Sequence, residues 1–145
     1  MKKIRATGGI FLSVRTGRVM LVQRAHDVSH PNKWGFVGGK IERGEDVLSG
    51  LSRELSEEIG FVPHFLKVIP FDHFVSADNR FEYSSLVIVT PNEFIPMLNH
   101  ENVGYCWVKP GNWPKPLHPG ARACLDNPDL IQNLENVGEK YNNLP

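Results

Sequence analysis

Three glutamates, Glu54, Glu57 and Glu58, lie in a stretch whose apolar residues recur with helical spacing. Each residue of an α-helix advances about 100°, so with Glu54 at zero, Glu57 falls at about −60° and Glu58 at about +40°. The three carboxylates therefore share one helix face, where like charges cost roughly 0.2–0.5 kcal/mol per pair. A divalent cation would relieve this repulsion, because Mg²⁺ prefers carboxylate and phosphate oxygens. From these three residues alone, the alternative is a solvated acidic face.

The glutamates belong to a longer pattern with fixed spacing. Along the chain, this pattern consists of Gly39, Glu45, Arg53-Glu54-Leu55, Glu57-Glu58 and Gly60-Phe61. It matches every fixed position of the Nudix box, a loop–helix–loop signature, and on this motif the chain resembles the Nudix hydrolases. The similarity to MutT-type members extends over about residues 4–108. The resemblance implies the Nudix fold, of the α/β (α+β) class, with a mixed β-sheet sandwiched between helices.

The resemblance also implies a cofactor and its ligands. In Nudix hydrolases the box helix holds divalent metal ions, and water attacks a phosphorus of the diphosphate. On this chain the implied ion is Mg²⁺, with Mn²⁺ as the alternative. The implied ligands are the carboxylates of Glu54, Glu57 and Glu58 and the carbonyl of Gly38. Neighbouring glycines leave room there for a backbone carbonyl to approach a metal.

Catalytic roles follow from the same resemblance. Glu54 and Glu57 are expected to take part in catalysis, and Arg53 is expected to orient a catalytic glutamate through a charge-assisted hydrogen bond. Glu45, at the start of the expected helix, is expected to brace the loop and to contact the arginine. A purely structural role is the alternative for Glu45. The chemistry agrees, since metals that bridge phosphate oxygens neutralise charge and generate a hydroxide-like nucleophile.

Two further residues outside the box are expected in the site. Glu101 precedes the segment 105–108, at a place where many family members have a loop glutamate, and it is the preferred general base. Its neighbour His100 is the substitute, and an exposed loop pair is the alternative for both. Arg24, after the second expected strand, is expected to pair with a substrate phosphate, with an ordinary surface arginine as the alternative.

The expected reaction is Mg²⁺-dependent cleavage of the diphosphate linkage in a nucleoside diphosphate joined to another moiety. Such substrates include ADP-ribose-like compounds, nucleotide sugars and dinucleotides. The alternative is a MutT-type (deoxy)nucleoside triphosphate pyrophosphohydrolase. Gly35 and Val37 depart from the MutT pattern, which weakens any carry-over of the function on oxidised nucleotides. A second alternative is a non-catalytic nucleotide-binding module, which the intact set of box glutamates disfavours.

Hydrophobic periodicity predicts the elements that position these residues. Residues 45–59 form the most secure helix, with Gly60 as its C-cap. Its apolar stripe is expected to consist of Leu48, Leu51, Leu55 and Ile59. Strands are expected over residues 4–14 and 19–22 as a hairpin, then over 34–39, 62–75, 81–89 and 104–108, followed by a helix over 128–141. Pro63 and Pro70 interrupt the segment 62–75, which is expected to be one broken strand or two short ones.

The aromatic residues and most histidines are expected to have structural roles. Core packing is the favoured interpretation for most of a set that could also stack on a base, namely Phe36, Phe74, Phe81 and Tyr83. Trp34 and Trp107 are expected to anchor the sheet. No functional role is expected for the histidines that lack metal-ligand spacing, namely His26, His30, His64, His73 and His118.

Composition narrows the class of protein. A chain of 145 residues with 41% hydrophobic residues is expected to form one domain over 1–145. Its 16 basic and 16 acidic residues argue against a nucleic-acid polymer or a membrane as partner, and the family resemblance implies a small nucleotide substrate. The absence of a signal peptide and of a long apolar run predicts a cytoplasmic protein, and Cys106 and Cys124 are expected to be free thiols. Family resemblance favours a homodimer.

Overall fold

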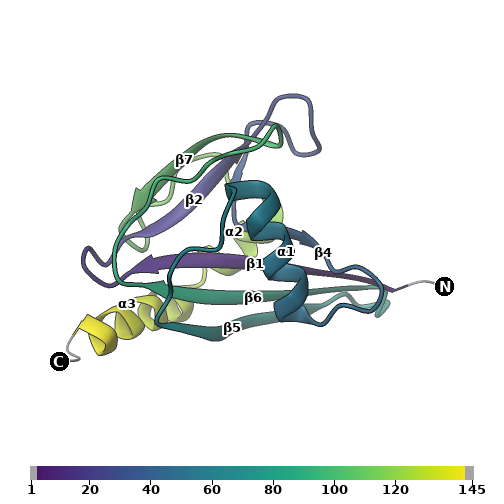
Figure 1. Ribbon diagram of the computed structural model, residues 1–145. Coiled ribbons are helices and arrows are strands. Elements are labelled where there is room, and N and C mark those ends of the chain that lie inside the picture. The colour runs from purple at the N-terminus through teal and green to yellow at the C-terminus, as the bar shows by residue number, and fades with distance from the viewer. Residues whose placement is uncertain (1–2, 143–145) are drawn as a thin grey trace.

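The computed structural model describes residues 3–142, which form seven strands and three helices. The elements, in chain order, are β1 (Ile4–Ser13), β2 (Val19–Arg24), β3 (Trp34–Gly35), β4 (Val37–Lys40), α1 (Val47–Ile59), β5 (Lys67–Val75), β6 (Phe81–Thr90), β7 (Asn102–Val108), α2 (Pro119–Leu125) and α3 (Pro128–Asn142). All seven strands belong to one mixed sheet (Figure 1).

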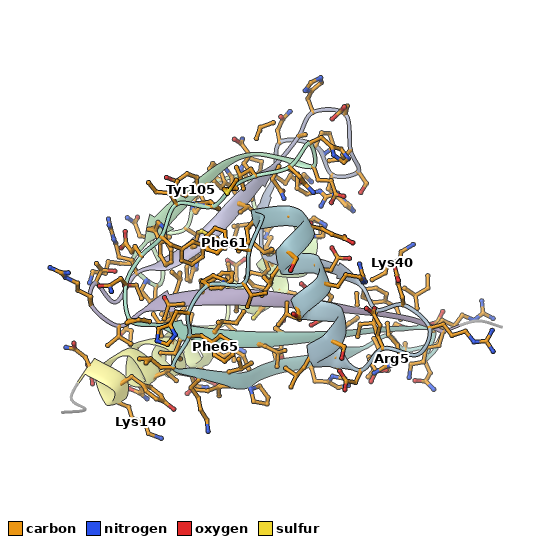
Figure 2. The ribbon with its side chains drawn as sticks, in the orientation of Figure 1. Arg5, Lys40, Phe61, Phe65, Tyr105 and Lys140 are labelled. Carbon is orange, nitrogen blue, oxygen red and sulfur yellow. The ribbon has the colours of Figure 1, made fainter. Side chains whose placement is uncertain are left out.

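Strand β1 is the centre of this sheet, and its two edges are used differently. One edge pairs along the whole strand with β6 in parallel. The other edge is shared by two antiparallel partners, β4 opposite residues 6–9 and β2 opposite residues 11–12. Arg5 and Lys40 consequently lie at the same end of the molecule, where β1 begins (Figure 2). Because β4 and β2 share this edge, Gly38 and Gly39 of β4 lie beside the first half of β1.

The sheet carries a helix layer on each face, which confirms the expected sandwich (Figure 1). On one face, α1 packs its apolar residues against Phe11, Met20 and Ile88. On the other face, α2 and α3 cover the residues of the strands that point the opposite way. The alternation along β1, with Phe11 on one side and Ile10 on the other, follows from the two-residue period of a strand.

Helix α1 begins two residues later than the sequence predicts and buries a narrower stripe. Asp46 is its N-cap and accepts a hydrogen bond from the Ser49 N–H at 2.7 Å. Gly60 ends the helix in the left-handed conformation, as expected for a C-cap. Leu51, Leu55 and Ile59 are buried, but Leu48 is 58% exposed, so its assignment to the apolar stripe was wrong. Leu48 lies in the first turn, at the edge of the stripe where the helix has no facing neighbour.

Three other elements differ from the sequence-based expectation. The segment expected as strand over 62–75 forms one strand, β5, only from Lys67, and this strand accommodates Pro70 at an irregularity in its pairing with β6. The strand expected over 34–39 is divided between β3 and β4 at Phe36. Helix α2 was not expected, because its seven residues are too few to show a helical period. Among the described residues, none of the helices has the length and apolarity to span a bilayer.

Candidate active site

Two glycines bring strand β4 into contact with β1 and α1. A Cβ atom on Gly38 would lie 2.0 Å from the backbone oxygen of Thr7, so only glycine fits beside β1 at this position. A Cβ atom on Gly39 would lie 2.6 Å from the Glu54 carboxylate, so that carboxylate rests directly on the strand. Gly38 and Gly39 therefore let the acidic face of α1 approach the backbone of the sheet.

Glu58 is the most buried acidic residue of the site. It is 3% exposed, and its carboxylate accepts a hydrogen bond from the Gly38 N–H at 2.8 Å. Burial, together with the neighbouring carboxyl groups of Glu54 and Glu101, raises the pKa of Glu58 to about 9. Burial also raises the pKa of Glu54. The carboxyl groups of Glu54, Glu58 and Glu101 are thus gathered in a partly desolvated cluster of like charge.

Arg53 organises the remaining acidic groups. Its guanidinium donates to Glu45 at 2.9 and 3.1 Å, to Glu54 at 3.1 Å and to the Lys40 carbonyl at 2.9 Å. Glu45 in turn accepts the Glu42 N–H at 2.7 Å, which braces the loop before α1 as expected. Two bonds from one planar group to Glu45 fix the arginine, so its remaining donor holds the Glu54 carboxylate in place.

Glu57 occupies the outer side of the same face. Its carboxylate contacts Arg53 at 3.4 Å and is 53% exposed. Within residues 3–142, no three histidine, cysteine or acidic side chains are arranged as a preformed metal site. The donors nevertheless suit a hard cation, because they are all carboxylate oxygens that repel one another. Mg²⁺ usually takes only one or two carboxylates and completes its shell with water and substrate phosphates.

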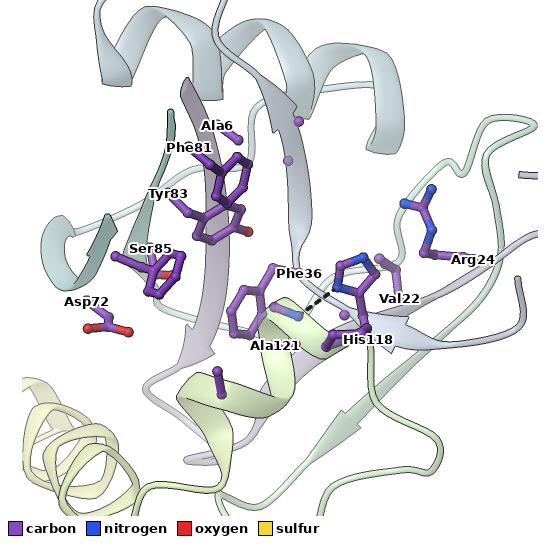
Figure 3. A pocket seen from close by; sticks show the side chains of 17 residues that line it. Ala6, Val22, Arg24, Phe36, Asp72, Phe81, Tyr83, Ser85, His118 and Ala121 are labelled. Carbon is purple, nitrogen blue, oxygen red and sulfur yellow. Dashed lines mark hydrogen bonds between the residues drawn. The ribbon is translucent and has the colours of Figure 1, made fainter. Parts of the chain in front are cut away.

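A cavity of about 440 Å³ opens on the other side of the two glycines (Figure 3). Its size lies within the range of small-molecule sites, and its lining is largely apolar with a few polar groups. Strands β5 and β6 contribute Asp72, Phe74, Phe81, Tyr83 and Ser85. The opposite wall is formed by Arg24 at the end of β2, by Phe36 and by residues around the start of α2, which include His118, Gly120 and Ala121.

The aromatic lining corrects one sequence-based expectation. Phe74 is 52% exposed and Phe81 is 37% exposed, so core packing was the wrong interpretation for both. Phe36 combines the two roles, since it packs against the core and also lines the cavity. Tyr83 lines the cavity beside Phe81, with the two rings stacked at a centroid distance of 6.4 Å. A sequence pattern does not distinguish these cases, because whether a half-buried ring faces a core or a cavity depends on what packs opposite.

The other expected residues are placed as follows. Arg24 lines the cavity, and its guanidinium donates to the carbonyl and hydroxyl of Ser29 at 2.6 and 3.0 Å. The backbone carbonyl of Glu101 accepts the Ala25 N–H at 2.8 Å, and its carboxyl group is near enough to Glu58 to raise the pKa of that residue. His100 is exposed.

Several structural expectations are confirmed. Trp34 and Trp107 pack against the core, and Cys106 and Cys124 are free thiols. His118, by contrast, was assigned no role and lines the cavity. The signal that could have found it is Pro119, a residue favoured in the first turn of a helix, directly after a residue able to cap that helix.

Comparison with known proteins agrees with this geometry. The family model described as the NUDIX domain matches residues 2–127. The 8-oxo-dGTP diphosphatase of Escherichia coli K12 is 41% identical over 66 residues, which cover 45% of this chain and 50% of that enzyme. The nucleoside triphosphatase NudI of Escherichia coli is 30% identical over 106 residues, covering 65% of this chain and 74% of that enzyme. The matched segments span about a third to a half of the first curated relatives.

A solved structure extends the similarity to the whole fold. The crystal structure of a Nudix hydrolase from Mycobacterium smegmatis, RenU, aligns with a TM-score of 0.68 at 18% identity and covers 99% of this chain and 89% of that one. At this identity the likeness concerns the fold alone. Because the family model spans most of the sequence, the chain belongs to the Nudix family.

Proposed function

We propose that this protein is a Mg²⁺-dependent pyrophosphohydrolase of small nucleotides, with the base in the cavity and the diphosphate over the carboxylates of α1. The observation that carries the proposal is the meeting of two unlike surfaces at Gly38 and Gly39. One side presents the crowded carboxylates of Glu54 and Glu58, and the other presents an apolar cavity with aromatic walls. A nucleotide has matching halves, since its base is flat and its phosphates bind divalent cations.

The residues of the site receive separate roles. The carboxylates of Glu54, Glu57 and Glu58 and the carbonyl of Gly38 would hold the ion. When bound, Mg²⁺ would offset phosphate charge and lower the pKa of water. Arg53 positions the Glu54 carboxylate, to which it donates a hydrogen bond. A carboxylate oxygen of Glu101 accepts the proton of the attacking water as general base.

For the substrate, we propose a nucleoside diphosphate joined to a second moiety, such as a nucleotide sugar. The cavity has two chemically different ends, which supports this choice. Phe81 and Tyr83 form an aromatic end, whereas Arg24 and His118 form a polar end on the other side of Phe36 (Figure 3). Phe74 also belongs to the aromatic end, since the centroid of its ring lies 6.3 Å from that of Phe81. A substrate with one group on each side of its diphosphate can use both ends.

A nucleoside triphosphate is the second candidate substrate. It is supported by the relatives, because the two Escherichia coli enzymes similar to this chain are an 8-oxo-dGTP diphosphatase and a nucleoside triphosphatase. Gly35 still departs from the MutT pattern. A Cβ atom at position 35 would lie 3.3 Å from the Cβ atom of His118, so a glutamate there would meet the wall of the cavity that His118 forms.

A substrate panel with Mg²⁺ tests the choice. The enzyme is incubated with nucleoside diphosphate sugars, dinucleotides and the eight common nucleoside and deoxynucleoside triphosphates. The reactions are run in ¹⁸O-water, and the product that carries the label identifies the attacked phosphorus. Turnover of the diphosphate compounds with a nucleoside monophosphate as product supports the first proposal. Turnover confined to triphosphates contradicts it and supports the second candidate.

Replacing one expected ligand tests the metal site. Glu57→Gln should lower turnover by orders of magnitude and raise the Mg²⁺ concentration needed for half-maximal rate, because a neutral amide binds the ion less well. Since Glu57 is half exposed, the melting temperature should stay near that of the wild type. Glu139→Gln, on an exposed part of α3, is the matched control. Wild-type activity in Glu57→Gln would contradict the assigned role.

Four broader predictions accompany the proposed function. A small nucleotide is the expected partner. The homodimer stays a prediction, and sedimentation velocity tests it by measuring the mass of the protein in solution. That residues 1–145 act as a single domain, and that the protein works in the cytoplasm, also remain predictions.

A further inference from the structure

His118 is held rigidly at the cavity although it lies outside the strands of the sheet. Its backbone N–H donates to the Trp34 carbonyl at 2.7 Å, and the Trp34 N–H donates to the Pro116 carbonyl at 2.9 Å. Leu117 and Trp34 form a parallel β-bridge between these two bonds. The proline-rich segment after β7 therefore adds a short extension to the edge of β3, and this extension fixes the position of the imidazole.

The protonation pattern of the ring follows from its neighbours. The Gly120 N–H donates to His118 Nδ1 at 3.0 Å, so Nδ1 carries no proton and the neutral ring has its proton on Nε2. Burial, together with the nearby basic groups of His30, Arg24 and Lys33, lowers the pKa of His118 to about 4. At neutral pH the side chain is consequently an uncharged hydrogen-bond donor, unsuited to act as a general base.

The free nitrogen of this ring is available to a ligand. Among the hydrogen bonds of residues 3–142, none uses His118 Nε2, and His30 contacts the ring by an edge-to-face arrangement at 4.5 Å. Figure 3 shows the imidazole beside Phe36, with one nitrogen bonded toward α2 and the other directed away from it. A flat base stacked on Phe36 would therefore bring its edge toward the Nε2–H group.

We propose that His118 is a specificity-determining residue, whose Nε2–H donates a hydrogen bond to a carbonyl oxygen on the edge of the substrate base. This inference rests on the proposed function. Guanine has an oxygen at position 6 and uracil has one at position 4, whereas adenine and cytosine have amino groups at those positions. An amino group facing an N–H donor leaves two donors opposed, so the cavity should favour bases of the keto type over bases of the amino type.

The substitution that isolates this role is His118→Asn. Asparagine is among the best N-cap residues, so its side-chain oxygen can keep the bond from the Gly120 N–H and thereby preserve α2. Its shorter side chain no longer reaches the position of Nε2. His64→Asn makes the same chemical change at an exposed histidine outside the cavity and serves as the control. Equal melting temperatures for the two variants would show that the fold is retained.

The experiment compares kcat/KM for GDP-, UDP-, ADP- and CDP-glucose, or for the four nucleoside triphosphates if only these are turned over. The wild-type enzyme and His64→Asn should prefer keto bases by about tenfold or more, since a lost and unsatisfied hydrogen bond commonly has an effect of this size. His118→Asn should lose this preference, through a lower kcat/KM for the guanine and uracil substrates only. An equal loss for all four substrates, or an unchanged preference, would overturn the proposal.

A direct binding measurement separates this inference from the proposed function. GMP, UMP, AMP and CMP are titrated into metal-free wild-type and His118→Asn protein by calorimetry. Tighter binding of GMP and UMP, lost in His118→Asn, would support the role of His118 even if no substrate of the panel is hydrolysed. Binding without base preference in the wild type would refute it, whatever the enzyme hydrolyses.

Discussion

Gly39→Ala gives the sharpest test of how the site is built. The added Cβ atom would lie 2.6 Å from a Glu54 carboxylate oxygen, whereas ordinary contacts begin at 3.4 Å, so the carboxylate must move by about 0.8 Å. The atoms in the way belong to the end of a flexible side chain, and Gly39 does not need the left-handed conformation, so the fold should survive. A misplacement of about 1 Å at a catalytic group costs about 10²-fold in rate, or about 2.7 kcal/mol of transition-state stabilisation.

The assay combines steady-state kinetics at saturating Mg²⁺ with thermal unfolding. Gly39→Ala should lower kcat by about 10²-fold while unfolding free energy changes by less than about 1 kcal/mol. Gly138→Ala, in helix α3, is the control, because the new methyl group meets only Leu12 Cδ2 at 3.9 Å. It should raise stability by about 0.5–1 kcal/mol with unchanged kcat. If Gly39→Ala kept at least a third of the wild-type kcat, the contact between strand β4 and Glu54 would have no catalytic importance.

Three more predictions concern stability and positioning. Arg53→Lys should lower kcat by about 10–100-fold, because one ammonium group cannot hold Glu45 and Glu54 at once. Steady-state kinetics measure the loss, and a kcat as high as that of the control Glu139→Gln would contradict the positioning role. Asp46→Ala removes the N-cap of α1 and should cost about 1 kcal/mol in a urea unfolding experiment, where an unchanged midpoint would contradict the capping role. Because the folded pKa of His118, about 4, lies below its unfolded value near 6.5, the unfolded state binds more protons between these values, so stability should fall from pH 6.5 to pH 4. His118→Asn should flatten that part of the pH profile of the melting temperature, and an unaltered slope would assign the dependence to other groups.

The box helix shows why part of this fold could be predicted from sequence. Its Gly60 cap and the burial of Leu55 and Ile59 follow from local rules of capping and periodicity. Leu48 shows the limit of those rules, because it has the right spacing but no neighbour to cover it. Helix α2 shows another limit, since seven residues are stabilised by packing on β3 rather than by their own periodic pattern.

The sequence by itself determined the family, the acidic face of the helix and the arginine that organises it, because all of these depend on spacing within one segment of the chain. The tertiary structure decided which carboxylate is buried, since Glu58 and Glu57 are adjacent in sequence, yet Glu58 is buried against the Gly38 N–H whereas Glu57 is 53% exposed beside Arg53. It also created the cavity, whose aromatic and polar ends come from segments about 35 residues apart or more. Burial and cavities arise from the packing of distant segments, and no local pattern encodes what packs opposite a given side chain.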